Sequence, residues 1–381
     1  MFLETTIKRN PRLVEVAYQL HNEGLLQPDT YVIDYDQTLD NAKMILEKAN
    51  EKNIKLYFML KQLGRNPLLA KAFMDLGYEG AVVVDYREAL VMMEHNIPLG
   101  NVGHLVQTPK HLIEPIVEYG TEVFTVFSFE KLQEINEAAK KFDKIQDVIL
   151  KVFNEGDVHY RAQEGGINLV DIPNFVEEAK KLKHVKIVGA TSFPAFLYSE
   201  KNQDVIKTQN YHTTYDAIEI WRDLGCEIKQ SNVPSTTSVR TLDKMDGTHG
   251  EPGHGLTGTT PAHAHQELEE VPSVVYLSEI SHNFKGKSYA YGGGYYRRSH
   301  LKKALVIEDE AHREVIDVLP MDPSSIDYYF ELSKNKKISS TVIMSFRFQI
   351  FVTRSRVAIV KGVKGDHPQL LGIFDSLGKE I

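Results

Sequence analysis

Apolar runs and helical patterns alternate along the first part of the chain. Short runs rich in Val, Ile, Leu and Ala are separated by longer stretches in which apolar residues recur every three or four positions. The short runs predict eight strands: Ile54–Leu60, Ala81–Val84, Ile97–Gly103, Glu122–Val126, Val148–Phe153, Val185–Gly189, Ile228–Ser231 and Gly247–Glu251. The longer stretches predict helices that include Leu68–Leu76, Thr108–Tyr119, Phe129–Phe142 and Ile172–Leu182.

Eight strands, most of them followed by a helix, predict an α/β fold of the (β/α)8 TIM-barrel type. The seventh and eighth runs are polar, so an open, doubly wound sheet stays as the alternative. After His265 the strand-like runs follow one another without long helices, and only Asp322–Leu332 has the pattern of a short helix. We expect a barrel over residues 28–265 and a mainly antiparallel β domain over 266–381, with residues 1–27 as a candidate to pack on the β domain.

Composition and net charge limit the kinds of molecule that the protein is expected to bind and the cellular compartment in which it is expected to occur. The formal net charge of −8 argues against nucleic acid or an anionic membrane as the main binding partner. The single cysteine, Cys226, excludes an intramolecular disulfide and suits a reducing compartment. Because no long apolar run and no signal-peptide pattern open the chain, we expect a cytoplasmic protein.

The residues that follow the barrel strands are the candidates for a site, because active sites of barrels lie at the carboxyl ends of the strands. These positions are Lys61, Asp85, His104, Ser128, the 154–166 loop, Ala190–Ser192, Asn232–Ser238 and Glu251–Gly258. Lys61 ends the apolar run Leu56–Leu60, where loss of hydration favours a neutral, nucleophilic amine. Such an amine forms Schiff bases with carbonyls, including the aldehyde of pyridoxal 5'-phosphate (PLP). A solvated lysine at the end of a strand is the plain alternative.

The last two of these loops have the composition of a phosphate site. In Glu251–Gly258 (Glu-Pro-Gly-His-Gly-Leu-Thr-Gly), glycines let main-chain N–H groups approach an anion. The loop after the seventh strand adds the hydroxyls of Ser235, Thr236 and Thr237. Barrels often bind phosphate with the loops that follow their seventh and eighth strands. Both loops also have the composition of ordinary turns.

Together these motifs resemble those of the fold-type III PLP enzymes: alanine racemases, ornithine and diaminopimelate decarboxylases, and D-threonine aldolases. A lysine after the first barrel strand and Glu-Pro-Gly after the last are similar to the pattern of the decarboxylases. Ala290–Arg297 (Ala-Tyr-Gly-Gly-Gly-Tyr-Tyr-Arg) resembles the racemase segment Gly-Tyr-Gly-Asp-Gly-Tyr-Pro-Arg. Within this group the chain most resembles the YhfX-like predicted amino-acid racemases, over almost its whole length.

The resemblance implies a role for each matching residue. Lys61 would carry PLP as a Schiff base, and Glu251 would pair with the pyridine nitrogen. Main-chain groups of Gly253 and His254, with Ser235, Thr236 and Thr237, would bind the phosphate. Tyr291 would come from the partner subunit of a head-to-tail homodimer and act opposite Lys61.

Three further positions complete the candidate cofactor-binding set, and several family features are missing. Asp85 follows a strand, and His104 is a candidate to stack on the cofactor ring. Arg161 or, as the alternative, Gln163 is a candidate to contact its phenolic oxygen. The decarboxylases' catalytic Cys-Asp segment and the aldolases' metal-binding His/Cys pair have no counterpart. Four histidines lie close together in the sequence: His249, His254, His263 and His265. No nearby cysteine completes a set of metal ligands with them, so we expect no metal site.

The resemblance therefore predicts a PLP-dependent amino-acid racemase or epimerase. Lys61 and Tyr291 would exchange the Cα proton on opposite faces of an amino-acid substrate, a small molecule. A carboxylate partner such as Glu251 favours a protonated pyridine ring, which is closer to the electronics of decarboxylases. Another PLP reaction, a non-catalytic PLP-binding protein and a PLP-free barrel hydrolase stay open, and the side chain of the substrate is not predicted.

Overall fold

The structure is a computed structural model that describes residues 1–381, and it contains two compact units. The first, which we call the barrel unit, comprises Lys43–Leu60 and Pro67–Gly253. The second, which we call the β unit, comprises Met1–Ala42, Lys61–Asn66 and His254–Ile381. No helix in either unit has both the length and the apolar character required to cross a bilayer.

The barrel unit contains a closed ring of eight parallel strands. The ring runs β5-β4-β3-β2-β12-β11-β8-β6, and the pairing of β6 with β5 closes it. Its strands are β2 (Lys55–Phe58), β3 (Gly80–Val83), β4 (Leu99–Val102), β5 (Val123–Val126), β6 (Gln146–Phe153), β8 (Val185–Thr191), β11 (Gln230–Asn232) and β12 (His249–Gly250). Each of the eight predicted strands is present, so the predicted TIM barrel is confirmed.

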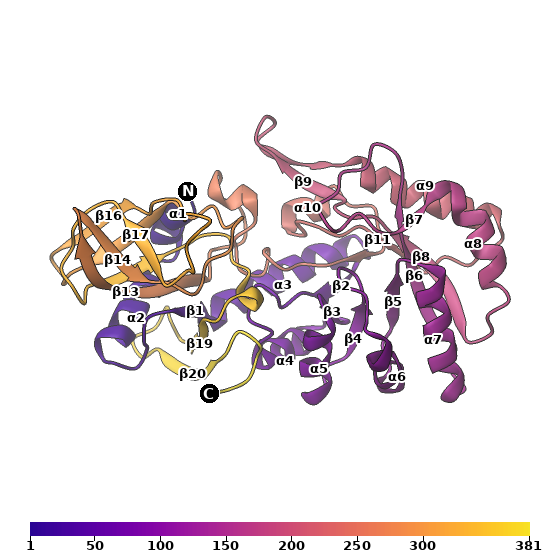
Figure 1. Cartoon of the computed structure of the whole chain (residues 1–381), viewed down its shortest axis with the longest axis horizontal. Coiled ribbons are helices and arrows are strands. Elements are labelled where there is room, and N and C mark those ends of the chain that lie inside the picture. The colour runs from indigo at the N-terminus through magenta and orange to yellow at the C-terminus, as the bar shows by residue number, and fades with distance from the viewer. The chain divides into compact units, whose positions relative to one another are not determined.

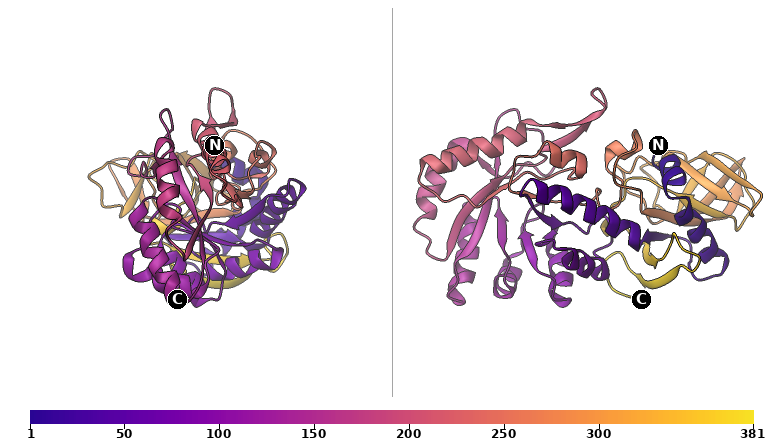
Figure 2. Two further views of the ribbon diagram at one scale, coloured as in Figure 1. Left: turned by 90° about the vertical axis from the view of Figure 1, so that its right-hand side faces the viewer. Right: turned by 180° about the vertical axis from the view of Figure 1, so that it is seen from behind.

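Helices cover the outside of the ring, as Figure 1 shows for α7 to α9 beside β6 and β8. They are α4 (Pro67–Leu76), α5 (Tyr86–Glu94), α6 (Lys110–Tyr119), α7 (Phe129–Lys141), α8 (Ile172–Ala179), α9 (Gln209–Asp223) and α10 (Val239–Asp243), with the short η1 (Leu169–Asp171). The small strand β7 (Ile167–Asn168) pairs with β6. A hairpin of β9 (Phe196–Ser199) and β10 (Asp204–Lys207) projects from the unit in both views of Figure 2.

Glycines set the closeness of some barrel strands. Strands β3 and β5 are fully buried, as expected where helices cover one face of a parallel sheet and the interior fills the other. At Gly189 in β8 an added Cβ would lie 1.9 Å from the carbonyl oxygen of Gln230, which belongs to the neighbouring strand β11. The Gln230 oxygen belongs to the main chain of a strand that is paired with β8, so no flexible side chain can move aside to make room for the methyl group.

We therefore predict that Gly189→Ala lowers the free energy of unfolding by about 3 kcal/mol, because the methyl group forces β8 and β11 apart. Gly165→Ala is the matched control: its added Cβ would meet only a side-chain atom of Phe127, at 3.6 Å. Urea unfolding of both variants, followed by circular dichroism, measures the difference. Equal stabilities of the two variants would contradict the predicted strand spacing.

The β unit is built on a mainly antiparallel sheet with the order β16-β15-β18-β13-β1-β19-β20. Strand β14 lies outside this order and pairs with β13 on one side and with β17 on the other. The strands are β1 (Thr30–Asp34), β13 (Val274–Phe284), β14 (Lys287–Tyr291), β15 (Lys303–Ile307), β16 (Arg313–Asp317), β17 (Tyr329–Leu332), β18 (Thr341–Met344), β19 (Arg356–Lys361) and β20 (Gln369–Phe374). Short 3-10 turns η2 (Pro261–Ala264) and η3 (Ile350–Val352) complete the unit.

Two N-terminal helices bury the apolar side of this sheet. They are α1 (Phe2–Arg9) and α2 (Pro11–Asn22), and their buried residues join one core cluster with Val32, Leu277 and Ala358 of the strands. Asn10 connects the helices to the sheet: its side chain accepts a hydrogen bond from the N–H of Leu13 and donates one to Asp34. Helix α3 (Tyr35–Glu51) then leads the chain into the barrel unit.

Two sequence expectations differ from the structure. The barrel was expected over 28–265, but strand β1 pairs with β13 and in parallel with β19, so it belongs to the β sheet. The segment Asp322–Leu332 was expected as a short helix, but its last four residues form strand β17. Pairing with β14, from Ser288↔Leu332 to Tyr291↔Tyr329, outweighs the local helical pattern there.

Candidate active site

A buried carboxylate lies at the carboxyl end of the barrel, directly after β12. The side chain of Glu251 is 1% exposed, as is that of His104, which follows β4. The nearest atoms of the two side chains, His104 Nε2 and Glu251 Oε2, are 3.3 Å apart. The structure thus brings together two of the predicted site residues from distant parts of the sequence.

Two buried amides complete the surroundings of Glu251. Asn101 of β4 donates from Nδ2 to Oε1 over 3.1 Å, and Asn232 of β11 donates from Nδ2 to the same oxygen over 2.7 Å. Thr125 of β5 in turn donates to Oδ1 of Asn101 over 2.7 Å. The carboxylate is therefore held in one orientation by residues from two separate strands of the ring, β4 and β11.

The loop after β11 has strained backbone and an unsatisfied hydroxyl. Ser235 and Thr236 have positive φ values of 101° and 50°, which residues other than glycine rarely adopt. The Thr236 hydroxyl is buried and has no hydrogen-bond partner. By contrast, Ser235 donates to the carbonyl of Phe196, and the Thr237 hydroxyl accepts from the N–H of Glu251. A buried, unpaired hydroxyl in such a loop fits a group that carries a phosphate.

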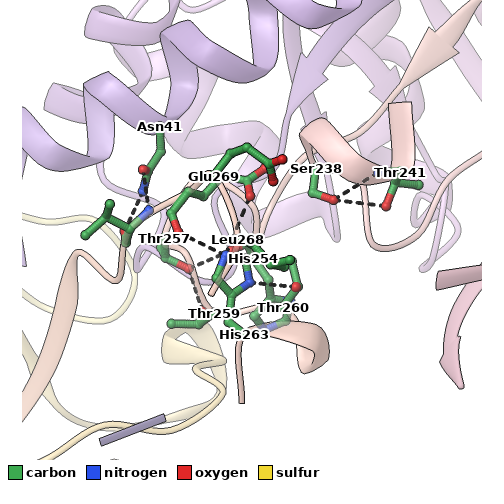
Figure 3. Close-up of polar contacts among 12 residues, drawn as sticks. Asn41, Ser238, Thr241, His254, Thr257, Thr259, Thr260, His263, Leu268 and Glu269 are labelled. Atoms are coloured by element: carbon green, nitrogen blue, oxygen red, sulfur yellow. Dashed lines mark hydrogen bonds and ion pairs between the residues drawn. The ribbon is translucent and has the colours of Figure 1, made fainter. Parts of the chain in front are cut away.

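The neighbouring Ser238 has a structural role that Figure 3 shows. The Ser238 hydroxyl caps α10 by accepting from the N–H of Thr241, and it lies 3.0 Å from the Thr241 hydroxyl. The Thr241 hydroxyl also lies 2.6 Å from the carbonyl oxygen of Thr236, to which it donates. The conformation of the 235–238 loop is therefore fixed by hydrogen bonds within the protein: Ser235 bonds to Phe196, and Thr236 and Ser238 bond to Thr241.

His254 follows Gly253 in sequence and belongs to the β unit, where its ring is held on both sides. Nε2 lies 2.8 Å from the carbonyl oxygen of Phe348 and must donate to it, so Nδ1 is the acceptor for the Gln62 amide at 3.3 Å. Loss of hydration and the positive charges of Arg347 and Lys61 lower the pKa of His254 well below its ordinary value. The side chain is thus a neutral structural group, and any anion here would meet main-chain N–H groups.

Lys61 comes three residues after the end of β2 and also belongs to the β unit. Its carbonyl oxygen accepts a hydrogen bond of 3.1 Å from the N–H of Phe351. Within the barrel unit, the buried Glu88 accepts from the N–H of Leu60 at 3.2 Å and from that of Val84 at 2.9 Å. Glu88 therefore fixes the main chain immediately before Lys61.

Asp85, Arg161 and Tyr291, the other predicted site residues, lie at the start of a helix, in a loop and at the end of a strand. Asp85 caps α5 by accepting from the N–H of Glu88. Arg161 is exposed in the loop after β6. Tyr291 ends β14 in the β unit, is 37% exposed and packs its ring against Tyr329. The cofactor contacts expected of these residues stay predictions.

The histidines considered for a metal have other partners. In the barrel unit His249 stacks on Tyr57, and burial lowers its pKa to about 3. In the β unit His263 is hydrogen-bonded to Thr260 (Figure 3). It also lies 3.2 Å from the carbonyl oxygen of Glu270. No group of three or more His, Cys, Asp and Glu side chains has the arrangement of a metal site.

Several polar residues at the carboxyl end were missed by sequence reasoning, and Lys151 of β6 is the most unusual. Its amine is buried over the ring of Phe127 and donates to the carbonyl of Gln163, in the loop that carries Arg161. Burial lowers the pKa of Lys151 to about 8. A lysine inside the apolar run Val148–Phe153 was the available signal.

This shift predicts a pH dependence of stability. Above pH 8 the folded chain releases a proton from Lys151, whereas the unfolded chain keeps it up to its ordinary pKa of 10.5. Because the unfolded state then binds more protons, stability rises with pH across that interval. We expect the stability of the wild type relative to Lys151→Met to rise by at most about 3 kcal/mol between pH 8 and 10.5.

Urea unfolding at a series of pH values measures this difference. Lys71→Met, which removes an exposed lysine from α4, is the control and should leave the profile unchanged. A constant difference between the wild type and Lys151→Met over the whole interval would show that the Lys151 amine is not desolvated in the folded chain.

Comparison with known proteins agrees with this arrangement. Residues 33–261 match the family model "Alanine racemase, N-terminal domain", and residues 275–370 match "YhfX-like, C-terminal domain". The "Uncharacterized protein YhfX" of Escherichia coli (strain K12) is 43% identical over 385 residues, which cover 100% of each chain.

Solved structures show the same fold at low identity. Alanine racemase of Clostridium difficile 630 is 19% identical with a TM-score of 0.63, covering 92% of this chain and 99% of that one. D-threonine aldolase of Filomicrobium marinum is 14% identical with a TM-score of 0.68, covering 93% and 96%. A diaminopimelate decarboxylase of Helicobacter pylori is 13% identical with a TM-score of 0.66, covering 94% and 96%. The chain therefore belongs to the alanine racemase-like, fold-type III family of PLP-dependent enzymes, and within it to the YhfX-like group.

Proposed function

We propose that the chain is a PLP-dependent amino-acid racemase or epimerase. The observation that supports PLP binding is the buried Glu251 carboxylate, held by two amides at the carboxyl end of a barrel of this family. Racemisation is supported by Tyr291 in the racemase-like segment Ala290–Arg297. When bound, PLP would supply an aldehyde that takes up the amino group of an amino acid and a ring that withdraws electrons from Cα. Glu251 would hold a proton on the ring nitrogen, which strengthens that withdrawal.

The remaining contacts would orient the cofactor. Lys61 would attach it covalently, and the strained loop at Ser235–Thr237 would bind its phosphate, with the unpaired Thr236 hydroxyl as one donor. Main-chain N–H groups of Gly253 and His254 would add to the same phosphate site, since the His254 ring nitrogens are already occupied. Asp85, His104 and Arg161 stay candidates for further contacts, and we assign no metal to the site.

Lys61 and Tyr291 would move the Cα proton, each on one face of the substrate. We propose that Tyr291 acts in the partner subunit's site of a head-to-tail homodimer, which its exposed position at the end of β14 supports. The substrate would be an amino acid. The single cysteine and the acidic net charge fit a cytoplasmic enzyme that binds neither nucleic acid nor membrane.

One observation favours a second candidate function. A carboxylate beside the ring nitrogen gives a stronger electron sink than racemisation requires, so decarboxylation or side-chain cleavage of an amino acid is the alternative. Release of carbon dioxide or of an aldehyde in incubations with amino acids would identify it. Exchange of the Cα hydrogen without loss of any carbon fragment would support the racemase.

We predict that Lys61→Ala abolishes covalent PLP attachment, because Lys61 is the amine proposed to form the Schiff base with its aldehyde. The measurement is the uptake of PLP that borohydride reduction makes permanent, detected by intact-protein mass. Lys71→Ala, at an exposed lysine of α4, is the matched control and should keep full labelling. If Lys61→Ala is labelled like the wild type, the cofactor lysine has been assigned wrongly.

For Tyr291→Phe we predict an asymmetric loss. Removal of one of two opposing bases should slow Cα deuterium uptake by about 100-fold or more with one enantiomer and leave exchange with the other. A panel of L- and D-amino acids in deuterated water, analysed by mass spectrometry, tests this and identifies the substrate. Equal losses with both enantiomers would argue that Tyr291 is not one of two bases.

A further inference from the structure

The two oxygens of the Glu251 carboxylate have different surroundings. Oε1 accepts from the amides of Asn101 and Asn232, and two donors fill the two lone pairs of one carboxylate oxygen. Oε2 lies beside His104 instead. A group that pairs with this carboxylate would therefore have to approach Oε2.

The chemistry of the neighbours fixes the orientation of both amides. An ionised carboxylate can only accept, so the NH2 group of Asn101 faces Glu251 and its amide oxygen accepts from the hydroxyl of Thr125. For Asn232, the opposite orientation would place two oxygens 2.7 Å apart. Both asparagines are completely buried, so water does not substitute for either donor.

We propose that Asn101 and Asn232 are positioning residues that act on the cofactor through Glu251. The proposal rests on the proposed function, in which Glu251 pairs with the ring nitrogen of PLP. By filling Oε1, the two amides direct Oε2 to the ring. Hydrogen bonds donated to an ionised carboxylate favour its charged form, so the shared proton stays on the ring nitrogen.

Thr125 extends this arrangement by one step. Its hydroxyl holds Asn101 but does not contact the carboxylate, so it contributes orientation and no direct donor to Glu251. The order of influence on the cofactor is therefore Glu251 first, then the two asparagines, then Thr125. A general loss of barrel stability would not produce this order.

The experiment is a double-mutant cycle on the full chain with PLP as the probe. Asn101→Ala should raise the dissociation constant of PLP about tenfold and shift the pH midpoint of the bound cofactor's absorbance. In a Glu251→Ala background the same change should alter the dissociation constant less than about twofold, because the amide no longer has its acceptor. Thr125→Val should have a smaller effect of the same kind.

A matched control is Asn136→Ala. Asn136 is also a buried amide that donates to a glutamate, Glu137, but it lies on helix α7. Its removal should lower the melting temperature and leave both the PLP affinity and the absorbance midpoint unchanged. If Asn101→Ala does not give folded protein, Asn232→Ala carries the same cycle.

The possible outcomes separate the two proposals. Equal effects of Asn101→Ala with and without Glu251, or an unchanged absorbance midpoint, would overturn the positioning role while PLP binding by the wild type still stands. A wild-type chain that takes up no PLP would overturn the proposed function and this inference with it. Loss of the effect in the Glu251→Ala background would establish that the asparagines act through that carboxylate.

Discussion

A buried carboxylate is stable only if hydrogen-bond donors replace the water that it has lost, and two glutamates impose this requirement on the end of the barrel. Glu251 takes its donors from β4 and β11, and its own N–H donates to Thr237. Glu88 takes its donors from the main chain after β2 and β3. Glu251 joins β4 and β11, which are not adjacent in the ring, and Glu88 joins the ends of the adjacent strands β2 and β3. The geometry of the proposed site therefore depends on hydrogen bonds that also connect the ends of the barrel strands.

The barrel was predictable because its periodic pattern is local. Each strand is a short apolar run, and even the polar pair β11 and β12 occurs where the repeat requires strands. The β unit was less predictable, because its pairing joins residues far apart in sequence, such as Thr30 with Arg356. No local signal separates β1 from a first barrel strand. The same limit explains Asp322–Leu332, where pairing with β14 determines the conformation.

The candidate site was likewise predictable where a local motif marks a residue and unpredictable where only the fold brings residues together. Motifs identified Glu251 and the Ser235–Thr237 loop, and the structure places Thr237 against the main chain of Glu251. Asn101 was missed, and Asn232 was a candidate position without an assigned role, because a polar residue within a strand gives no indication of its partner. Asn101 and Asn232 are ordinary amides in the sequence, and only the order of strands in the closed ring brings both to one carboxylate.

The central position of β1 has a consequence for how the chain is made. During synthesis β1 leaves the ribosome early, but its neighbours β13 and β19 begin at Val274 and Arg356. The whole sequence of the barrel unit is translated in between, so that unit has all its strands while α1, α2 and β1 still lack a sheet to cover. Long-range pairing of this kind is slow to form. The first strand to be made is thus among the last to find its place, and the nascent chain must keep an apolar segment soluble until its C-terminal strands emerge.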